Sequence, residues 1–90
     1  MGSVVFRSEV IIEGEIGLVS RPQLVEAVRL LRDNPEAGKP LTRALKGCRS
    51  IRVGGSENRL VYMLHGEDVE VIAIERRRES AAYDTAERRV

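Results

Sequence analysis

Three short runs of apolar and β-branched residues limit the fold of this chain more than any other feature. They cover about residues 48–54, 59–64 and 69–75. Two short segments, 54–58 and 65–68, connect these runs, and both contain glycine, which tolerates the positive φ angles of tight turns. Connections this short force neighbouring strands to run antiparallel. The sequence therefore predicts a three-stranded antiparallel meander.

The last of these strands is apolar at almost every position. By strict alternation, one of its faces carries Val69, Val71 and Ala73. The opposite face carries Ile72 and Ile74. A strand with apolar residues on both faces is covered on both sides. We therefore expect this strand in the interior of the sheet.

One main helix is predicted over residues 21–33. Ser20 suits the N-cap, with Gln23 three residues later as in a capping box, and Pro22 suits the first turn. Apolar residues then recur at helical spacing, at positions 24, 27, 28 and 31. The helix ends at Asn34, because the residue before a proline is biased away from helical backbone. One face of this helix is expected to pack on the sheet.

The segments before this helix predict a strand and a linker. Residues 4–12 are rich in β-branched side chains and predict a first strand. The next segment, 13–19, contains Gly14 and Gly17, a composition that disfavours a helix.

Short helical segments are expected in two further places. One helical turn is predicted over residues 41–45. A short C-terminal helix is predicted over 81–89, with Ser80 as its cap. Arg88 and Arg89, at the end of that helix, are expected to be solvated. The predicted fold class is therefore α+β: a small antiparallel meander of three to four strands with one main helix packed on it and a short C-terminal helix.

Composition sets the broad class of the protein. The chain has 90 residues, which supports one domain, residues 1–90, with a small core. Its single cysteine, Cys48, excludes an internal disulfide, and a place in a predicted strand favours a buried thiol over a reactive one. The sequence starts with no cationic and apolar leader and contains no long uncharged apolar run. We therefore expect a cytoplasmic protein.

The distribution of charge is more informative than its total. The net charge is +1, but residues 1–38 carry −2 and residues 39–90 carry +3. Arginines gather at the ends of the predicted strands, where several guanidinium groups on one surface could grip a phosphodiester. A solvated charged surface, or pairing with acids such as Glu70 and Glu75, would give a similar composition.

The order of several motifs resembles the RelE/ParE superfamily of bacterial and archaeal toxins. The resemblance covers roughly residues 22–90. It rests on a helix that ends in Asn34-Pro35, the loop Gly38-Lys39-Pro40-Leu41, the turn Leu45-Lys46-Gly47, the strands Arg49-Ser50-Ile51-Arg52-Val53 and Arg59-Leu60-Val61-Tyr62, and the arginines 76–78 followed by Tyr83.

The resemblance also exposes a departure from the family pattern. Members place two antiparallel helices between the first strand and the loop, whereas here only residues 13–19 precede Ser20. We therefore expect a first helix that is missing or reduced to a turn, unless this segment extends the first strand. Apolar surface left open by that loss would be covered by another copy of the chain or by a partner, which the resemblance identifies as a cognate antitoxin.

The resemblance implies an activity and a set of catalytic residues. RNase members cut mRNA in the ribosomal A site by attack of a 2′-hydroxyl on the adjacent phosphate, without a metal or cofactor. By position, Arg59 matches the phosphate-binding arginine, Arg77 the arginine near the leaving group, and Tyr83 the tyrosine that orients the nucleotide. Arg52 stands in place of a lysine; it keeps the charge, but a guanidinium is a poor proton acceptor. The base is therefore open, with Tyr83 as a candidate.

Four further residues are expected to contact RNA, namely Arg49, Ser50, Arg76 and Arg78. Strand alternation places Ser50 on the same face as Arg52 and puts Arg49 on the other. Tyr62 is expected in the core rather than as a stacking platform. His65 is expected to be an ordinary turn residue.

Three functions remain open at this point. The first is a RelE-like, ribosome-dependent endoribonuclease with mRNA, the ribosome and an antitoxin as partners. The second is a ParE-like toxin that inhibits DNA gyrase without cutting anything. The third is a member of the superfamily that retains only antitoxin binding, and self-association is possible in each case.

Overall fold

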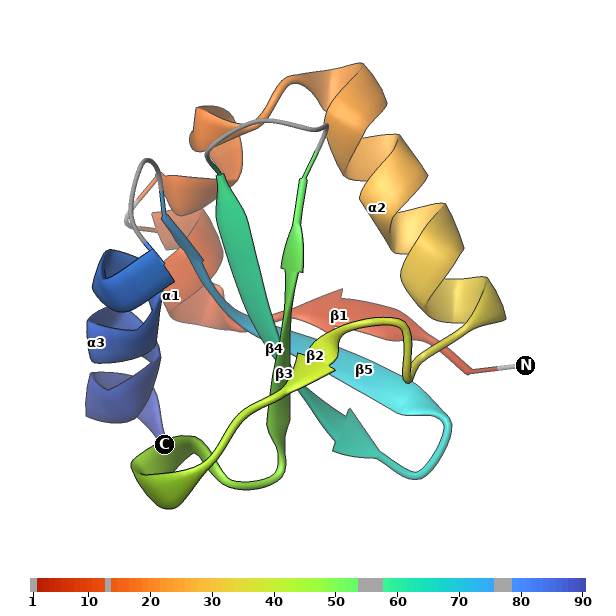
Figure 1. The fold of residues 1–90 in the computed structure, drawn as a ribbon. Helices are drawn as coiled ribbons and strands as arrows, with labels where there is room; N and C mark the ends of the chain where they lie inside the picture. Colours follow the sequence, from red (N-terminus) through yellow and green to blue (C-terminus); the bar gives the residue numbers. More distant parts are fainter. Residues whose placement is uncertain (1, 13, 54–57, 76–78) are drawn as a thin grey trace.

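The computed structural model describes residues 2–12, 14–53, 58–75 and 79–90, and a twisted five-stranded sheet forms its centre (Figure 1). The strands are Val4–Phe6 (β1), Lys39–Pro40 (β2), Cys48–Arg52 (β3), Arg59–His65 (β4) and Asp68–Glu75 (β5). The helices are Ser8–Ile12 (α1), Arg21–Asp33 (α2) and Glu79–Arg89 (α3), with two 3-10 turns at Glu15–Leu18 (η1) and Arg43–Leu45 (η2).

The strand order is β1-β5-β4-β3-β2. Strands β3, β4 and β5 form the predicted antiparallel meander. The sheet gains two short edge strands: β1 runs parallel to β5, and β2 runs antiparallel to β3. The predicted α+β class is confirmed, with five strands in place of three to four.

Helix α2 has the predicted bounds and covers one face of the sheet, while α3 lies on the other side (Figure 1). The Ser20 hydroxyl accepts from the Gln23 backbone N–H, and the Gln23 side chain accepts from the Ser20 backbone N–H, so the capping box is complete. Ala27 and Leu31 are the buried residues of the apolar stripe. They join the core between α2 and the sheet.

Strand β5 lies in the interior of the sheet, as predicted, but its side chains do not alternate strictly. Val61 of β4 faces Ala73, and the next residue of β4 faces Val71, so Ile72 is an extra residue in β5. This β-bulge turns Ile72 and Ala73 to the same core, under α3, and returns Ile74 to the core under α2. The predicted alternation is therefore correct through Ile72 and wrong for Ala73 and Ile74, because no residue type in the strand marks the bulge.

The prediction of one strand over residues 4–12 is wrong after Phe6. The last pairing contact is the Arg7 backbone N–H, which donates to the Val71 carbonyl at 2.9 Å. The chain then turns into α1, a helix of five residues. Lack of a strand partner outweighs the β propensity of Val10 and its neighbours here, since that propensity depends on a sheet to pair with. The expected reduction of the first helix is present.

The C-terminal helix begins at Glu79, so Ser80 lies within the helix and is not its cap. The prediction that Arg89 is solvated is also wrong. Its guanidinium forms a two-pronged ion pair with the carboxylate of Glu15, and the two side chains are only 6% and 9% exposed. Arg88 remains exposed, as expected.

The ion pair satisfies backbone groups at the edge of β5. Arg89 Nη1 donates to the Ile72 carbonyl at 2.8 Å, and Glu15 Oε1 accepts from the Ile74 N–H at 2.9 Å. These two groups come just after the point where β1 stops pairing with β5. The two side chains therefore replace a strand that the sheet lacks at this edge.

A second set of contacts fixes the loop before β2. The buried hydroxyl of Tyr62 donates to the Pro35 carbonyl and accepts from the Gly38 N–H, both at 2.8 Å. Arg49 Nη1 donates to the carbonyls of Glu36 at 3.1 Å and Gly38 at 2.8 Å. Tyr62 is thus a core residue, as predicted, with its hydroxyl serving the loop.

Gly38 cannot be replaced in this loop without movement. A Cβ atom at this position would lie 2.6 Å from the Tyr62 hydroxyl and 2.9 Å from the Ser50 carbonyl oxygen. The loop therefore lies directly against β3 and β4, where β2 begins.

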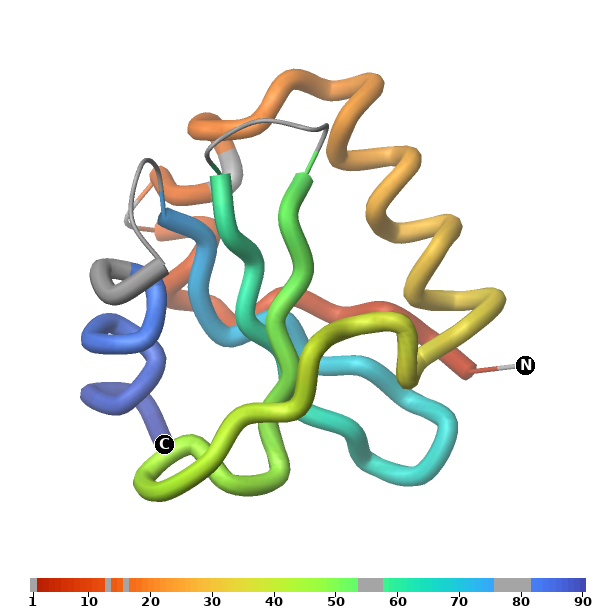
Figure 2. Tube along the Cα trace, in the orientation of Figure 1, coloured from red at the N-terminus to blue at the C-terminus, as the bar shows by residue number. Residues whose placement is uncertain are grey.

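The ends of the described chain lie on opposite sides of the molecule (Figure 2). Among the helices of the described ranges, none is long and apolar enough to cross a membrane.

The buried ion pair generates a prediction about stability. Arg89→Met leaves the Glu15 carboxylate buried without its partner and should lower the free energy of unfolding by about 3–5 kcal/mol. Its exposed neighbour provides the control: Arg88→Met should change that free energy by less than about 0.5 kcal/mol. Urea denaturation would measure both, and equal effects of the two substitutions would contradict this role for Arg89.

The Tyr62 hydroxyl generates a second prediction. Tyr62→Phe leaves the buried Gly38 N–H without its acceptor and should cost about 1–3 kcal/mol. Burial also raises the pKa of Tyr62 in the folded state. Above about pH 10, where an unfolded tyrosine loses its proton, the wild-type free energy of unfolding should therefore fall with pH.

Below that pH both states keep the proton, so this contribution is constant. The Tyr62→Phe variant should lack this part of the alkaline decline. Unfolding in urea at a series of pH values, from neutral to about pH 11, would measure it. Parallel pH profiles for the two proteins would rule out the proposed titration.

Candidate functional site

Two arginines lie directly opposite each other at one end of the sheet. Arg52, the last residue of β3, pairs with Arg59, the first residue of β4. Arg59 in turn pairs with Glu75 of β5. Like charges that face each other across two strands destabilise a sheet. The pairing of the two guanidinium groups therefore concentrates positive charge at this end of the sheet.

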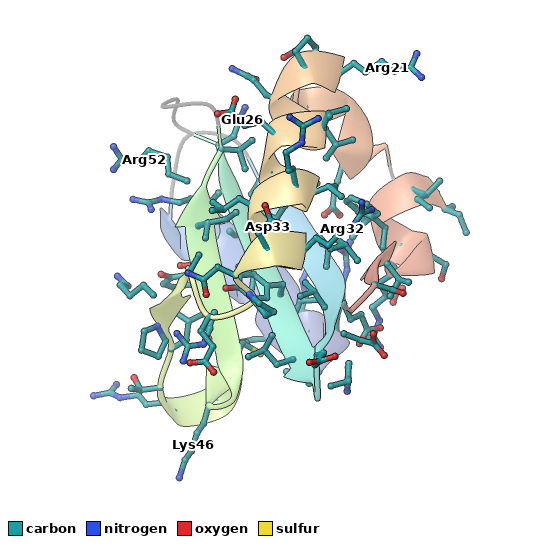
Figure 3. The ribbon with its side chains drawn as sticks, turned by 90° about the vertical axis from the view of Figure 1, so that its right-hand side faces the viewer. Arg21, Glu26, Arg32, Asp33, Lys46 and Arg52 are labelled. Carbon is teal, nitrogen blue, oxygen red and sulfur yellow. The ribbon has the colours of Figure 1, made fainter. Side chains whose placement is uncertain are left out.

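The hydroxyl of Tyr83 identifies the face on which these arginines lie. Tyr83 belongs to α3, and its hydroxyl lies 3.2 Å from the hydroxyl of Ser50 in β3. Arg52 is two residues further along β3 and therefore shares this face with Ser50. Its cross-strand partner Arg59 shares it too. Arg52 itself extends away from the sheet (Figure 3).

The structure thus gathers four of the sequence-predicted site residues on the α3 face, namely Ser50, Arg52, Arg59 and Tyr83. Ser50 is buried, Arg59 and Tyr83 are partly buried, and Arg52 is exposed. The site therefore runs from the hydroxyl groups of Ser50 and Tyr83, beneath α3, to the exposed guanidinium of Arg52 at the end of β3. This arrangement can hold an anionic group against the sheet with hydroxyls beside it.

The other predicted RNA contacts are not part of this cluster. Arg49 lies on the opposite face, as strand alternation predicts, and there it donates to the carbonyls of Glu36 and Gly38. Arg76, Arg77 and Arg78 lie outside the described residues.

A carboxylate that the sequence analysis treated only as a pairing partner also faces the site. Glu75 lies opposite Arg59 in the sheet, and its Oε1 accepts from the Thr85 hydroxyl of α3 at 2.8 Å. The predicted hairpin could have revealed this neighbour. If residues are paired outward from the 65–68 turn, position 75 comes close to position 59. The bulge changes that count by one residue and hides the match.

Two other residues with reactive side chains lie apart from the site. His65 ends β4 at the far end from Arg59, and its Nε2 lies 3.0 Å from the Glu70 carboxylate. Cys48 is buried at the start of β3, and burial raises the pKa of its thiol. A raised pKa disfavours the reactive thiolate, in agreement with the expected inert role.

Comparison with solved structures places this fold among bacterial toxins. A doubly substituted form of the E. coli toxin RelE in its free state matches with a TM-score of 0.72 and 25% sequence identity, over 99% of this chain and 97% of that one. The Mycobacterium tuberculosis toxin–antitoxin complex RelBE2 matches with a TM-score of 0.58 and 24% identity, over 84% and 91% of the two chains.

A third structure, described as a chromosomal ParDE toxin–antitoxin system from P. aeruginosa, matches with a TM-score of 0.58 and 18% identity, over 87% of this chain and 98% of that one. At these identities the last two structures show the fold alone.

Comparison by sequence identifies the family. No curated protein matches the chain in sequence. A family profile does match, over residues 21–81, and it describes the ParE toxin of the type II toxin–antitoxin system parDE. This span includes α2, the meander and its two opposed arginines. The chain therefore belongs to the ParE toxin family of type II toxin–antitoxin systems, within the RelE/ParE superfamily.

Proposed function

We propose that this toxin is a RelE-like, metal-independent endoribonuclease that cuts mRNA on the ribosome. The observation that carries this proposal is the register of Arg52 with Arg59, which concentrates two fixed positive charges beside the Ser50 and Tyr83 hydroxyls. Cleavage by a 2′-hydroxyl builds negative charge on the phosphate, and cations held in advance around that phosphate lower the barrier. The likeness to free RelE over almost the whole chain supports the same activity.

The arginines divide the work by position. Arg59 is partly buried and lies between Arg52 and Glu75, so it is the better placed to hold the scissile phosphate deep on the sheet. Arg52 is exposed and can close on the same phosphate from the strand end. Arg77, which the superfamily resemblance puts near the leaving oxygen, completes this proposed set.

Two groups on this face can accept the proton of the 2′-hydroxyl. Tyr83 presents its phenol next to Ser50, and Glu75 presents a carboxylate opposite Arg59. The Thr85 hydroxyl already occupies one oxygen of Glu75. We favour Tyr83 as the base, because its hydroxyl lies 3.2 Å from the Ser50 hydroxyl, which can turn to donate or accept.

A second function has its own support. The matching family profile is that of ParE rather than RelE, and Arg52 stands where the active RNases of the superfamily carry a lysine. A ParE-like toxin would inhibit DNA gyrase and leave RNA intact. Supercoiling by purified gyrase in the presence of the toxin separates the two functions, since only the ParE-like toxin would block it.

A cognate antitoxin is the expected partner in both cases. Two of the structural neighbours are described as toxin–antitoxin systems. Helix α2 exposes Val25 at 50% and Leu30 at 47%, and the reduced helix α1 exposes Ile12 at 80%. Apolar residues this open beside the sheet suit a partner helix.

The opposed arginines generate a prediction about activity. Arg52→Ala and Arg59→Ala should each slow cleavage by a factor of about 10²–10³, the usual effect of removing one group that stabilises transition-state charge. The melting temperature of Arg52→Ala should stay the same or rise, because the substitution relieves the repulsion from Arg59. That of Arg59→Ala should change little, because the lost pairing with Glu75 offsets the relieved repulsion. Primer extension on a translated message after brief induction would show the cuts.

Arg21→Ala is the matched control, since Arg21 is an exposed arginine on α2, on the other side of the sheet. It should leave codon-phased cleavage unchanged. Full toxicity and full cleavage in both site variants would show that the proposed site is wrong.

The base can be identified by a comparison of three variants. Ser50→Ala removes the hydrogen bond to Tyr83 but keeps the phenol, whereas Tyr83→Phe removes the phenol and keeps the ring. If Tyr83 is the base, Tyr83→Phe should lose most of the rate and Ser50→Ala should lose much less. Single-turnover cleavage of ribosome-bound message measures the rate of each variant and of the wild type.

Glu75→Gln completes the set, because it keeps the shape and removes the charge. A large loss in Glu75→Gln with a fully active Tyr83→Phe would transfer the role of base to Glu75.

A further inference from the structure

Lys39 lies beside the site on a strand that the sequence analysis did not expect. Strand β2 consists of Lys39 and Pro40, and Lys39 pairs with Ser50 of β3. Cross-strand partners point to the same face of a sheet. Lys39 therefore belongs to the face that holds Ser50 and Tyr83, although it comes from a different strand from the arginines.

The loop before Lys39 is fixed from the opposite face of the sheet. Tyr62 and Arg49 bond the backbone of residues 35–38, and Gly38 packs against both Tyr62 and the Ser50 carbonyl. A loop held by this many contacts presents the next residue in one place. The backbone position of Lys39 is thus set in advance, which helps to place a binding residue.

A cavity of about 290 Å³ opens next to this lysine. Its lining includes Lys39 and Arg43 as cations, Tyr83 as an aromatic ring, Leu41 and Leu45 as apolar floor, and Glu87 of α3 as an acid. Arg43 has φ of 57°, a backbone conformation that residues other than glycine rarely adopt and that gathers at binding sites.

The two cations outnumber the one acid, Glu87, and together with the aromatic ring and the apolar floor they suit a nucleotide. Phosphate oxygens suit the lysine and the arginine, and a flat base suits the ring. The phenol of Tyr83 connects this cavity to Ser50, so a ligand here would continue into the site of Arg52 and Arg59.

We infer that Lys39 is a substrate-binding residue that contacts a phosphate of the nucleotide next to the cleaved bond, where that nucleotide lies against Tyr83 as the superfamily resemblance implies. The inference deepens the proposed function, because it names the part of the RNA that a neighbouring strand holds. It also supplies a lysine from β2 where β3 itself carries only Ser50 and Arg52.

The test compares Lys39→Ala, Lys39→Arg and the matched control Lys46→Ala. Lys46 is also exposed, but it does not line the cavity, and it follows η2 and projects from the lower end of the molecule (Figure 3). The first measurement is the affinity for a single-stranded RNA whose 2′-O-methyl groups prevent cleavage, over a series of salt concentrations. One lost phosphate contact should reduce the slope of log affinity against log salt by about 0.7.

Lys39→Ala should show this reduced slope, Lys39→Arg should restore it, and Lys46→Ala should keep the wild-type slope. The second measurement is single-turnover cleavage of ribosome-bound message, in which Lys39→Ala should be slower by about 10-fold or more, the usual effect of losing one hydrogen bond to a charged group. Unchanged melting temperatures would show that these effects come from contact with RNA rather than from folding.

The two measurements distinguish failure of the proposed function from failure of the proposed binding site. If wild-type protein does not cut message but its RNA affinity depends on Lys39, the proposed function is wrong and the binding site stands. If wild-type protein cuts message and Lys39→Ala has the same salt slope as wild type, the binding site is wrong. Absence of RNA binding by the wild-type protein would also overturn it.

Discussion

The buried ion pair between Glu15 and Arg89 joins the two ends of the fold to its central sheet. Residue 15 comes before the main helix and residue 89 closes the last one, yet both bond the same stretch of β5. Burial of two charges is costly unless every remaining donor and acceptor is used. Here Glu15 accepts a hydrogen bond from the Ile74 N–H, and Arg89 donates one to the Ile72 carbonyl. The two charged side chains therefore satisfy backbone groups that no strand pairs with at this edge of the sheet.

The same stretch of β5 contains the bulge, on the side that pairs with β4, and the bulge changes which residues face α3. The extra residue Ile72 turns toward α3 together with Ala73, against Ala82 and Ala86 of the helix. Alanines let α3 approach closely but bury little area. The ion pair and the hydrogen bonds of Arg89 therefore help to hold the helix in place. Its position in turn brings Tyr83 to β3, so the geometry of the candidate site depends on contacts at the opposite edge of the sheet.

Local signals in the sequence predicted the main helix and the meander. The capping residue Ser20 and the glycines of the turns act within a few residues, so their effect does not depend on the rest of the fold. Contacts between distant segments were not predictable. Arg89 looks like any solvated terminal arginine until Glu15 is placed beside it, and the alternation rule misses the bulge. The same limit applies to the site. Alternation along the strand correctly placed Ser50 and Arg52 on one face, but the position of Lys39 beside Ser50 depends on the pairing of β2 with β3, which no sequence pattern shows.

The separation of the two charged partners has a consequence for how the protein folds. Glu15 and Arg89 are 74 positions apart in the chain. Contacts of such long range form late, because closing a long loop costs entropy before any contact offsets it. The meander and α2 can form from nearby segments, but α3 gains its anchor only when the final part of the chain is present. Tyr83 then reaches Ser50 in the same step, so a nascent chain would hold its arginines in register well before its site is complete.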